Sequence, residues 1–125
     1  MEQPFDIAAA RRNLMKATQL RAERIAALYR KASDDAGRII RLIAEKYRPG
    51  RMYQWGSLLN PSSFAEYSDI DIAVEGIESA EDFFALYGDA MKLTDFPLDI
   101  VQMEKIEPEF AQIIRTRGRV VYERS

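Results

Sequence analysis

An apolar segment interrupted by aspartates, residues 69–74, constrains the fold more than any other part of this sequence. Because side chains alternate between the two faces of a β-strand, Asp69 and Asp71 would lie on one face and three branched apolar side chains on the other. A second segment of the same character, residues 98–101, carries Asp99. Neighbouring strands lie about 4.8 Å apart, so pairing of the two would bring the third carboxylate beside the first two.

Three carboxylates gathered at one place predict a divalent metal. Like charges at short range oppose one another's ionisation, and a cation between them removes the conflict. Carboxylate oxygens are hard ligands that suit Mg²⁺ or Mn²⁺. The pattern therefore predicts Asp69, Asp71 and Asp99 as metal ligands and as catalytic residues.

Upstream of the aspartates, the sequence predicts a phosphate-binding turn. Residues 52–55 have the character of a short strand that runs into Gly56-Ser57, and residues 58–60 can form one helical turn before Pro61. A glycine lets the backbone approach a phosphate closely, and the serine hydroxyl can donate a hydrogen bond to it. Gly56 and Ser57 are accordingly the predicted nucleotide-binding residues.

The order of these features resembles the minimal nucleotidyltransferases of the polymerase-beta-like superfamily. That family is similar in having a Gly-Ser turn, a spacer of around ten residues, an Asp-x-Asp strand and a later strand with a third aspartate. The resemblance spans Arg51 to Tyr122 and implies an α+β nucleotidyltransferase fold: a mixed β-sheet of about four strands packed on helices, here with an N-terminal helical extension.

The same resemblance implies the chemistry. Asp69 and Asp71 would hold two Mg²⁺ ions, Asp99 would complete the site, and a nucleoside monophosphate would pass from an NTP, as AMP from ATP, to a hydroxyl acceptor. One departure matters: many relatives carry basic residues directly after Gly-Ser, where this chain has residues 58–61, Leu-Leu-Asn-Pro. Three readings stay open, namely a weaker enzyme, a basic group supplied from elsewhere or by a partner, and a nucleotide-binding protein without catalysis.

The resemblance also implies a protein partner. Minimal enzymes of this kind are often paired with a helical HEPN-type protein, commonly as the antitoxin of an RNA-cleaving toxin, and can attach AMP to that partner. The alternative function is a binding module of the same fold that neutralises its partner by contact alone. Residues 58–61 favour this alternative, and the intact aspartates oppose it.

Composition bounds the remaining possibilities. With 125 residues, 47% of them hydrophobic, the chain is expected to form a single domain, residues 1–125, with a helical extension over 1–48 and a nucleotidyltransferase core over 51–122. No apolar run is long enough to span a membrane and the first ten residues lack signal-peptide character, so a cytoplasmic location is expected. The absence of cysteine and histidine excludes disulfides, the usual zinc sites and a histidine base.

Two helices are predicted in the first third of the chain. Residues 7–30 are rich in helix-forming residues, and residues 33–35, Ser-Asp-Asp, could cap a second helix that ends before Pro49 and packs on the sheet. The first helix is basic: residues 1–31 carry a net charge of +4, against −6 for the rest of the chain. It could be a solvated helix that packs through Leu14, Ala17, Ile25 and Leu28, a surface for a partner, or a site of self-association. Nucleic-acid binding is disfavoured by the acidic chain as a whole.

The remaining elements follow from local signals. Ser79 could cap a helix that runs to about Lys92, with Phe83, Phe84, Leu86 and Tyr87 on its buried side. Pro108 could open a last helix near its first turn, and residues 119–123 have the composition of a final strand.

Overall fold

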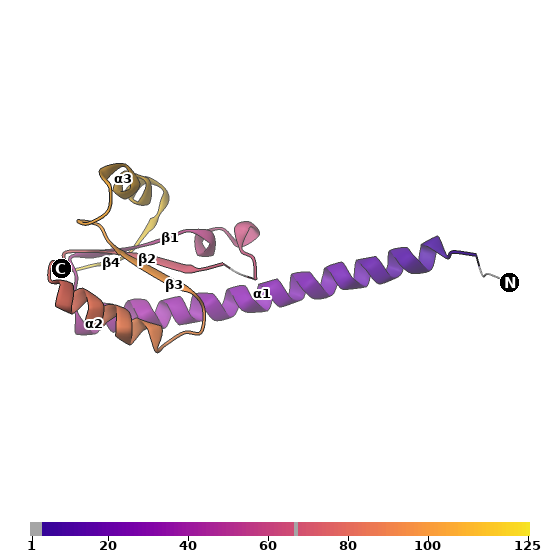
Figure 1. Ribbon diagram of the computed structural model, residues 1–125, viewed down its shortest axis with the longest axis horizontal. Helices are drawn as coiled ribbons and strands as arrows, with labels where there is room; N and C mark the ends of the chain where they lie inside the picture. Colours follow the sequence, from indigo (N-terminus) through magenta and orange to yellow (C-terminus); the bar gives the residue numbers. More distant parts are fainter. Residues whose placement is uncertain (1–3, 67) are drawn as a thin grey trace.

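A four-stranded mixed sheet forms the centre of the fold (Figure 1). The computed structural model describes residues 4–66 and 68–125. The strands, in the spatial order β3-β2-β1-β4, are β1 (Arg51–Trp55), β2 (Ile70–Glu75), β3 (Leu98–Gln102) and β4 (Arg119–Glu123). Strands β2 and β3 are parallel, whereas β1 is antiparallel to both of its neighbours. The predicted α+β fold with a mixed sheet of about four strands is confirmed.

Helices cover both faces of this sheet. Helices α1 (Ile7–Lys46) and α2 (Ala80–Met91) lie on one face, and α3 (Pro108–Arg117) lies on the other (Figure 1). Two short 3-10 turns, η1 (Ser57–Leu59) and η2 (Pro61–Ser63), connect β1 toward β2. The sheet is thus the middle layer of three, and it holds the predicted site residues at the end of β1 and along β2 and β3.

The alternation predicted for residues 69–74 divides the core into two parts. Ile70, Ile72 and Val74 are fully buried in the larger core beneath α1 and α2. Ala73, on the other face, packs with Tyr53 in a smaller core beneath α3. The aspartates therefore share the α3 face of the sheet, as the period of two requires.

The prediction of two N-terminal helices was wrong, because α1 is one continuous helix of 40 residues. Residues 33–35 do not cap a new helix: Asp35 is buried, with 1% of its surface exposed. Its carboxylate pairs with Arg38 and accepts a hydrogen bond from Thr94 Oγ1 at 2.7 Å, in the segment after α2. Since Arg38 on the same helix and Thr94 far along the chain satisfy the carboxylate, it does not compete for the helix backbone and the helix continues.

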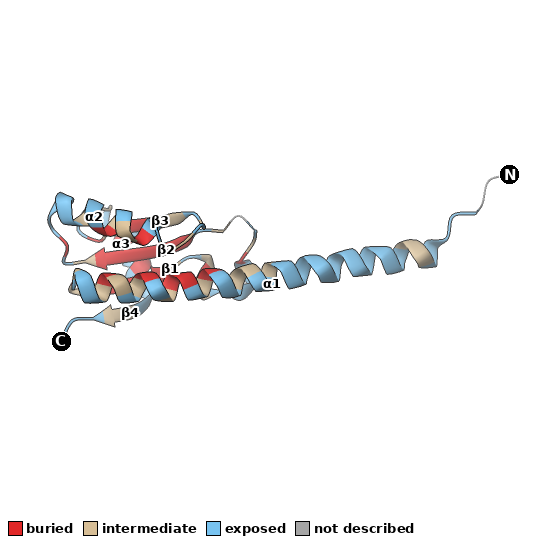
Figure 2. Cartoon of the chain, turned by 90° about the horizontal axis from the view of Figure 1, so that it is seen from below, coloured by how far each residue is buried: buried red, intermediate tan, exposed pale blue. Residues whose placement is uncertain are grey.

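Residues 7–24 of α1 project beyond the sheet and add no residue to the core of the described chain (Figures 1 and 2). At their base, Arg24 forms an ion pair with Glu66 at 3.2 Å. We call residues 7–24 the α1 arm; it is about 27 Å long at 1.5 Å per residue. Every residue from 11 to 24 is exposed, so the expected packing of Leu14 and Ala17 was wrong. From Ile25 onward α1 contacts the core, so the expected packing of Ile25 and Leu28 is confirmed.

The other elements lie close to their predicted positions. The hydroxyl of Ser79 accepts a hydrogen bond from the Asp82 amide at the start of α2, and Leu86 on that helix is fully buried. Phe84 is 71% exposed, so its predicted burial was wrong: it lies on the solvent side of the helix, whereas Phe83 and Tyr87 pack against the core. In the described part of the chain, no helix has an apolar stretch sufficient to cross a bilayer.

Candidate functional site

The three predicted aspartates come from adjacent positions on the α3 face of the sheet. Asp71 of β2 lies directly opposite Asp99 of β3 in the parallel register, and Asp69 lies one residue before β2. Asp71 is buried with 9% of its surface exposed, Asp99 is half-buried, and Asp69 is exposed. Pairing of the two strands, which the sequence could only suggest, thus brings the third carboxylate beside the first two.

Asp71 has a pKa raised from 3.8 to about 6. Burial is the largest cause, followed by repulsion from the charges of Asp69 and then Asp99. A carboxylate surrounded in this way is poorly solvated and lacks compensating positive charge. The site therefore favours either a proton or a cation at Asp71.

The Gly-Ser turn packs directly on this carboxylate. Gly56 has a φ of +83°, a conformation that side chains disfavour. A Cβ atom built at Gly56 would lie 2.2 Å from Asp71 Oδ2, so only glycine leaves room for both groups. The turn and the aspartates thus form one continuous site, and this contact explains the glycine in physical terms.

A cavity of about 540 Å³ opens beside the turn. It lies between the loop after β1 and helix α3. Its polar lining comes from Ser57, Asn60, Ser63 and Arg117, and its apolar lining includes Trp55, Ile113 and Ile114. Mostly apolar walls with a few polar groups are typical of small-molecule sites.

Trp55 contributes an unsatisfied donor to this region. Its indole Nε1 is buried and has no hydrogen-bond partner among the described residues. Its ring is held edge-on against Phe110 of α3, with ring centroids 5.2 Å apart. Of the two aromatic residues at the end of β1, Tyr53 is therefore the core residue, whereas Trp55 lines the cavity.

Arg117, at the end of α3, is the residue that sequence reasoning missed. It is the one charged side chain lining the cavity among the described residues. No local motif indicated it, because it approaches the Gly-Ser turn only through the pairing of β4 with β1. The loss of basic residues after Ser57 was the one signal that a cation should be sought elsewhere.

The donor set fits a hard divalent cation. The described residues contain no group of three acidic side chains already drawn together as metal ligands. Even so, Asp71 and Asp99 face each other in the register and Asp69 lies one residue before β2. Burial, and then the charges of Asp69 and Asp99, raise the pKa of Asp71. Carboxylate oxygens at such positions have the chemistry that Mg²⁺ and Mn²⁺ require.

Comparison with known proteins agrees with this geometry. The family described as "Polymerase beta, Nucleotidyltransferase" matches residues 38–125. No match is found among curated protein sequences.

Solved toxin–antitoxin structures share the fold. A toxin–antitoxin structure with AMP-PNP has a TM-score of 0.59 at 22% identity and covers 70% of this chain and 73% of that one. The MntA–HepT complex has a TM-score of 0.55 at 20% identity, covering 73% and 72%. A tri-AMPylated Shewanella oneidensis HEPN toxin in complex with MNT antitoxin has a TM-score of 0.55 at 21% identity, covering 74% and 72%.

Proposed function

The chain belongs to the polymerase-beta nucleotidyltransferase family, and we propose that it transfers AMP from ATP to a hydroxyl group of a helical protein partner. The observation that carries this proposal is the contact of Gly56 with Asp71, which in turn faces Asp99. Transfer of a nucleotide requires a phosphate-binding turn in contact with an acidic cluster. In this proposal residues 51–122 form the transferring core, and residues 1–48 form the extension.

Asp69, Asp71 and Asp99 would hold two Mg²⁺ ions, for which Mn²⁺ is the closest substitute. Bound there, the metal would lower the pKa of the acceptor hydroxyl and offset the charge of departing pyrophosphate. The fit of the metal to this site rests on the facing positions of Asp71 and Asp99 and on the raised pKa of Asp71.

The chain's own residues would position the substrates. Gly56 allows the nucleotide phosphates to approach the backbone, and the Ser57 hydroxyl would donate to a phosphate oxygen. The acceptor oxygen would form a bond to the α-phosphorus as the bond to pyrophosphate breaks. Asp99, half-buried at the strand edge, would take the acceptor's proton and pass it to water.

Calorimetric titration with AMP-PNP tests the nucleotide site. We expect binding by the wild-type protein with Mg²⁺, little binding without it, and none by Asp69→Asn/Asp71→Asn, because that variant removes two of three metal ligands. Circular dichroism should show that the double variant is folded. Binding that is equally strong without Mg²⁺, or in the double variant, would contradict the proposed site.

The α1 arm supports a protein partner for this function. Ile7, Leu14 and Met15 on the arm are each more than 60% exposed, and Leu14, Met15 and Ala22 line a shallow groove along the surface of the helix. These residues continue the stripe of α1 that packs on the sheet further along, at Ile25. A large apolar surface left exposed on a projecting helix indicates an interaction site.

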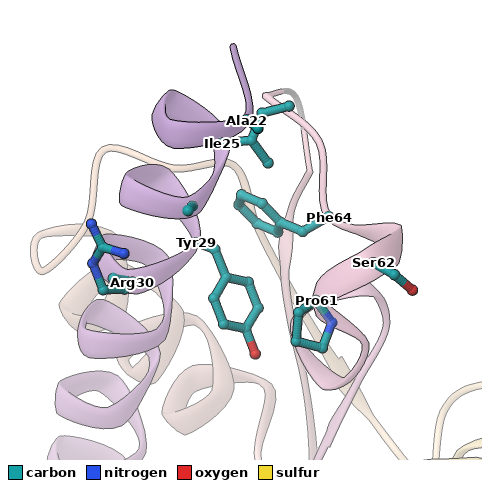
Figure 3. A pocket seen from close by; sticks show the side chains of 8 residues that line it. Ala22, Ile25, Tyr29, Arg30, Pro61, Ser62 and Phe64 are labelled. Atoms are coloured by element: carbon teal, nitrogen blue, oxygen red, sulfur yellow. The ribbon is translucent and has the colours of Figure 1, made fainter. Parts of the chain in front are cut away.

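A second cavity, of about 410 Å³, lies at the base of the arm, where α1 faces η2 (Figure 3). Ile25, Tyr29 and Phe64 form its apolar lining, with the rings of Tyr29 and Phe64 packed edge to face at 5.4 Å. The Tyr29 hydroxyl donates to the Leu58 carbonyl at 2.9 Å. A partner in this cavity would therefore contact the segment that continues from the Gly-Ser turn.

The charge of this surface favours an acidic helical partner over a second copy of the chain. Residues 7–31 contain seven basic residues and one acidic residue. Pairing two such arms would bring like charges together, whereas a helix with acidic flanks would complement them. The same surface supports the second candidate function, an antitoxin-like module that neutralises its partner by contact.

Changing the arm should separate partner binding from nucleotide binding. We expect Leu14→Gln/Met15→Gln to weaken capture of a HEPN-type partner by about 100-fold, because two apolar side chains lose their buried contacts. Affinity for AMP-PNP should be unchanged. The matched control is Leu20→Gln, a 61% exposed arm residue that lines neither the groove on the arm nor the cavity at its base. Equal capture by the double variant and the wild type would refute the arm as the partner surface.

A further inference from the structure

No basic residue directly follows Ser57 in this chain, where residues 58–61 are Leu-Leu-Asn-Pro. Many members of the family that this chain resembles carry positive charge directly after the Gly-Ser turn. Here Leu58 stands first and is buried, with 4% of its surface exposed. Leu58 belongs to the core under α1, so its backbone position cannot offer a side chain to a phosphate. If ATP is the substrate, as proposed above, its triphosphate needs a cation from another element.

Arg117 is placed to supply this charge. It lines the same cavity as Gly56 and Ser57, and it comes from a different element, the last residue of α3. Its side chain is exposed and makes no hydrogen bond or ion pair with any other residue in the described ranges. A free guanidinium at a cavity rim is a suitable ligand for phosphate oxygens, because its planar fork can donate two parallel hydrogen bonds.

The neighbouring arginines are already engaged. Arg115, two residues earlier on α3, pairs with Glu75 at 3.3 Å. Arg119, on β4, donates to Gln54 Oε1 at 3.5 Å. Arg117 therefore differs from both in having its full donor capacity available to a ligand.

Close packing at Gly118 holds Arg117 in this position. A Cβ atom at Gly118 would lie 2.5 Å from the Ile114 carbonyl oxygen and 3.0 Å from that of Gln54. The Gly118 amide also donates to the Ile114 carbonyl at 2.8 Å, which closes α3. The end of α3 is thus pressed against β1 two residues before the Gly-Ser turn.

We propose that Arg117 binds the polyphosphate of the nucleotide and replaces the basic residue absent from the Gly56-Ser57 turn. This inference rests on the proposed function and names the group that recognises its substrate. The ligand class is a nucleoside triphosphate, because the terminal phosphates carry the charge that the arginine would meet. A nucleoside or nucleoside monophosphate would depend on it much less.

Affinity measurements with a series of ligands test this assignment. AMP-PNP, AMP and adenosine are titrated in the presence of Mg²⁺ into the wild-type protein, Arg117→Gln, Arg117→Lys and the matched control Arg115→Gln. We expect Arg117→Gln to weaken AMP-PNP binding by about 10-fold to 100-fold, and AMP binding by less than about 3-fold. Arg117→Lys should recover part of the loss, and Arg115→Gln should bind like the wild type.

The outcomes separate this inference from the proposed function. If the wild-type protein binds AMP-PNP and Arg117→Gln binds it with equal affinity, the proposed role of Arg117 is overturned, whereas the nucleotide site is still supported. Equal losses for AMP-PNP and adenosine would also overturn it, because a change in cavity shape would then explain the effect. No AMP-PNP binding by the wild-type protein would overturn the proposed function, and with it this assignment.

Discussion

Replacing Asp71 with Asn is expected to lower AMP transfer by at least about 100-fold while stabilising the metal-free protein at pH 8. Transfer is lost because Asp71 is the central carboxylate: it faces Asp99, follows Asp69 and touches the Gly56 turn. Stability is gained because its charge is poorly accommodated when no cation is present. Opposite effects on activity and stability are typical of a functional site.

The sign of the stability effect follows from the pKa of Asp71, which the fold raises from 3.8 to about 6. Between about pH 4 and pH 6 the unfolded chain releases this proton while the folded chain keeps it, so the free energy of unfolding falls as pH rises. Above about pH 6 the free energy of unfolding stays lowered by a constant amount, on the order of 2–3 kcal/mol. The neutral amide of Asn avoids the loss and should raise the melting temperature at pH 8 by about 5 °C or more.

Thermal unfolding from pH 4 to pH 8 without divalent metal measures this effect. Asp95→Asn is the matched control, since Asp95 is exposed in the loop between α2 and β3. Its melting curve should follow the wild type at every pH. Transfer of labelled AMP to a captured partner, with AMP-PNP binding as a second readout, measures the loss of function. A melting temperature at pH 8 no higher in Asp71→Asn, or transfer retained by it, would contradict the prediction.

Replacing Gly56 with Ala is expected to abolish nucleotide binding and to destabilise the fold by about 1–3 kcal/mol. The new methyl group would lie 2.2 Å from Asp71 Oδ2, and the residue would keep a φ of +83° that alanine disfavours. Either the turn or the carboxylate must move. Both belong to the proposed site, so a single methyl group would disturb the phosphate-binding turn and the metal ligands together.

Gly88→Ala is the matched control for this change. Gly88 lies in the interior of α2, and a Cβ atom there has no neighbouring atom within 4 Å. Alanine at this position should raise the free energy of unfolding by about 0.5–1 kcal/mol and leave nucleotide binding unchanged. Calorimetry with AMP-PNP and urea unfolding measure both variants. Wild-type affinity in Gly56→Ala would show that the turn does not approach the phosphates.

Local sequence patterns predicted most of the elements that build the site. The alternation over residues 69–74 predicted which side chains face the core, because the period of two is a property of any strand. Ser79 marked the start of α2, because its hydroxyl accepts a hydrogen bond from a free backbone N–H of the first turn. Pro108 marked the start of α3, because the first turn of a helix does not need the N–H that proline lacks. These signals are short-range, so they can be read without knowing the fold.

The errors arose where distant residues change the meaning of a local signal. Residues 33–35 have the composition of a helix cap, yet Asp35 is satisfied by Thr94, a residue far along the chain. Leu14 and Ala17 have the spacing of a packed helix face, yet no other element of the described chain reaches them. Sequence spacing indicates which side chains share a face, but not whether another element covers that face.

Order and periodicity along the chain were enough to indicate the family and the sheet, and to single out three aspartates as candidate ligands. Three relations became visible only in the folded chain: Asp99 faces Asp71, Gly56 leaves room for the Asp71 carboxylate, and Arg117 lines the cavity beside the turn. The physical reason is that these relations arise from strand pairing and close packing between segments far apart in sequence. Their geometry follows from the sheet register, which no local pattern encodes.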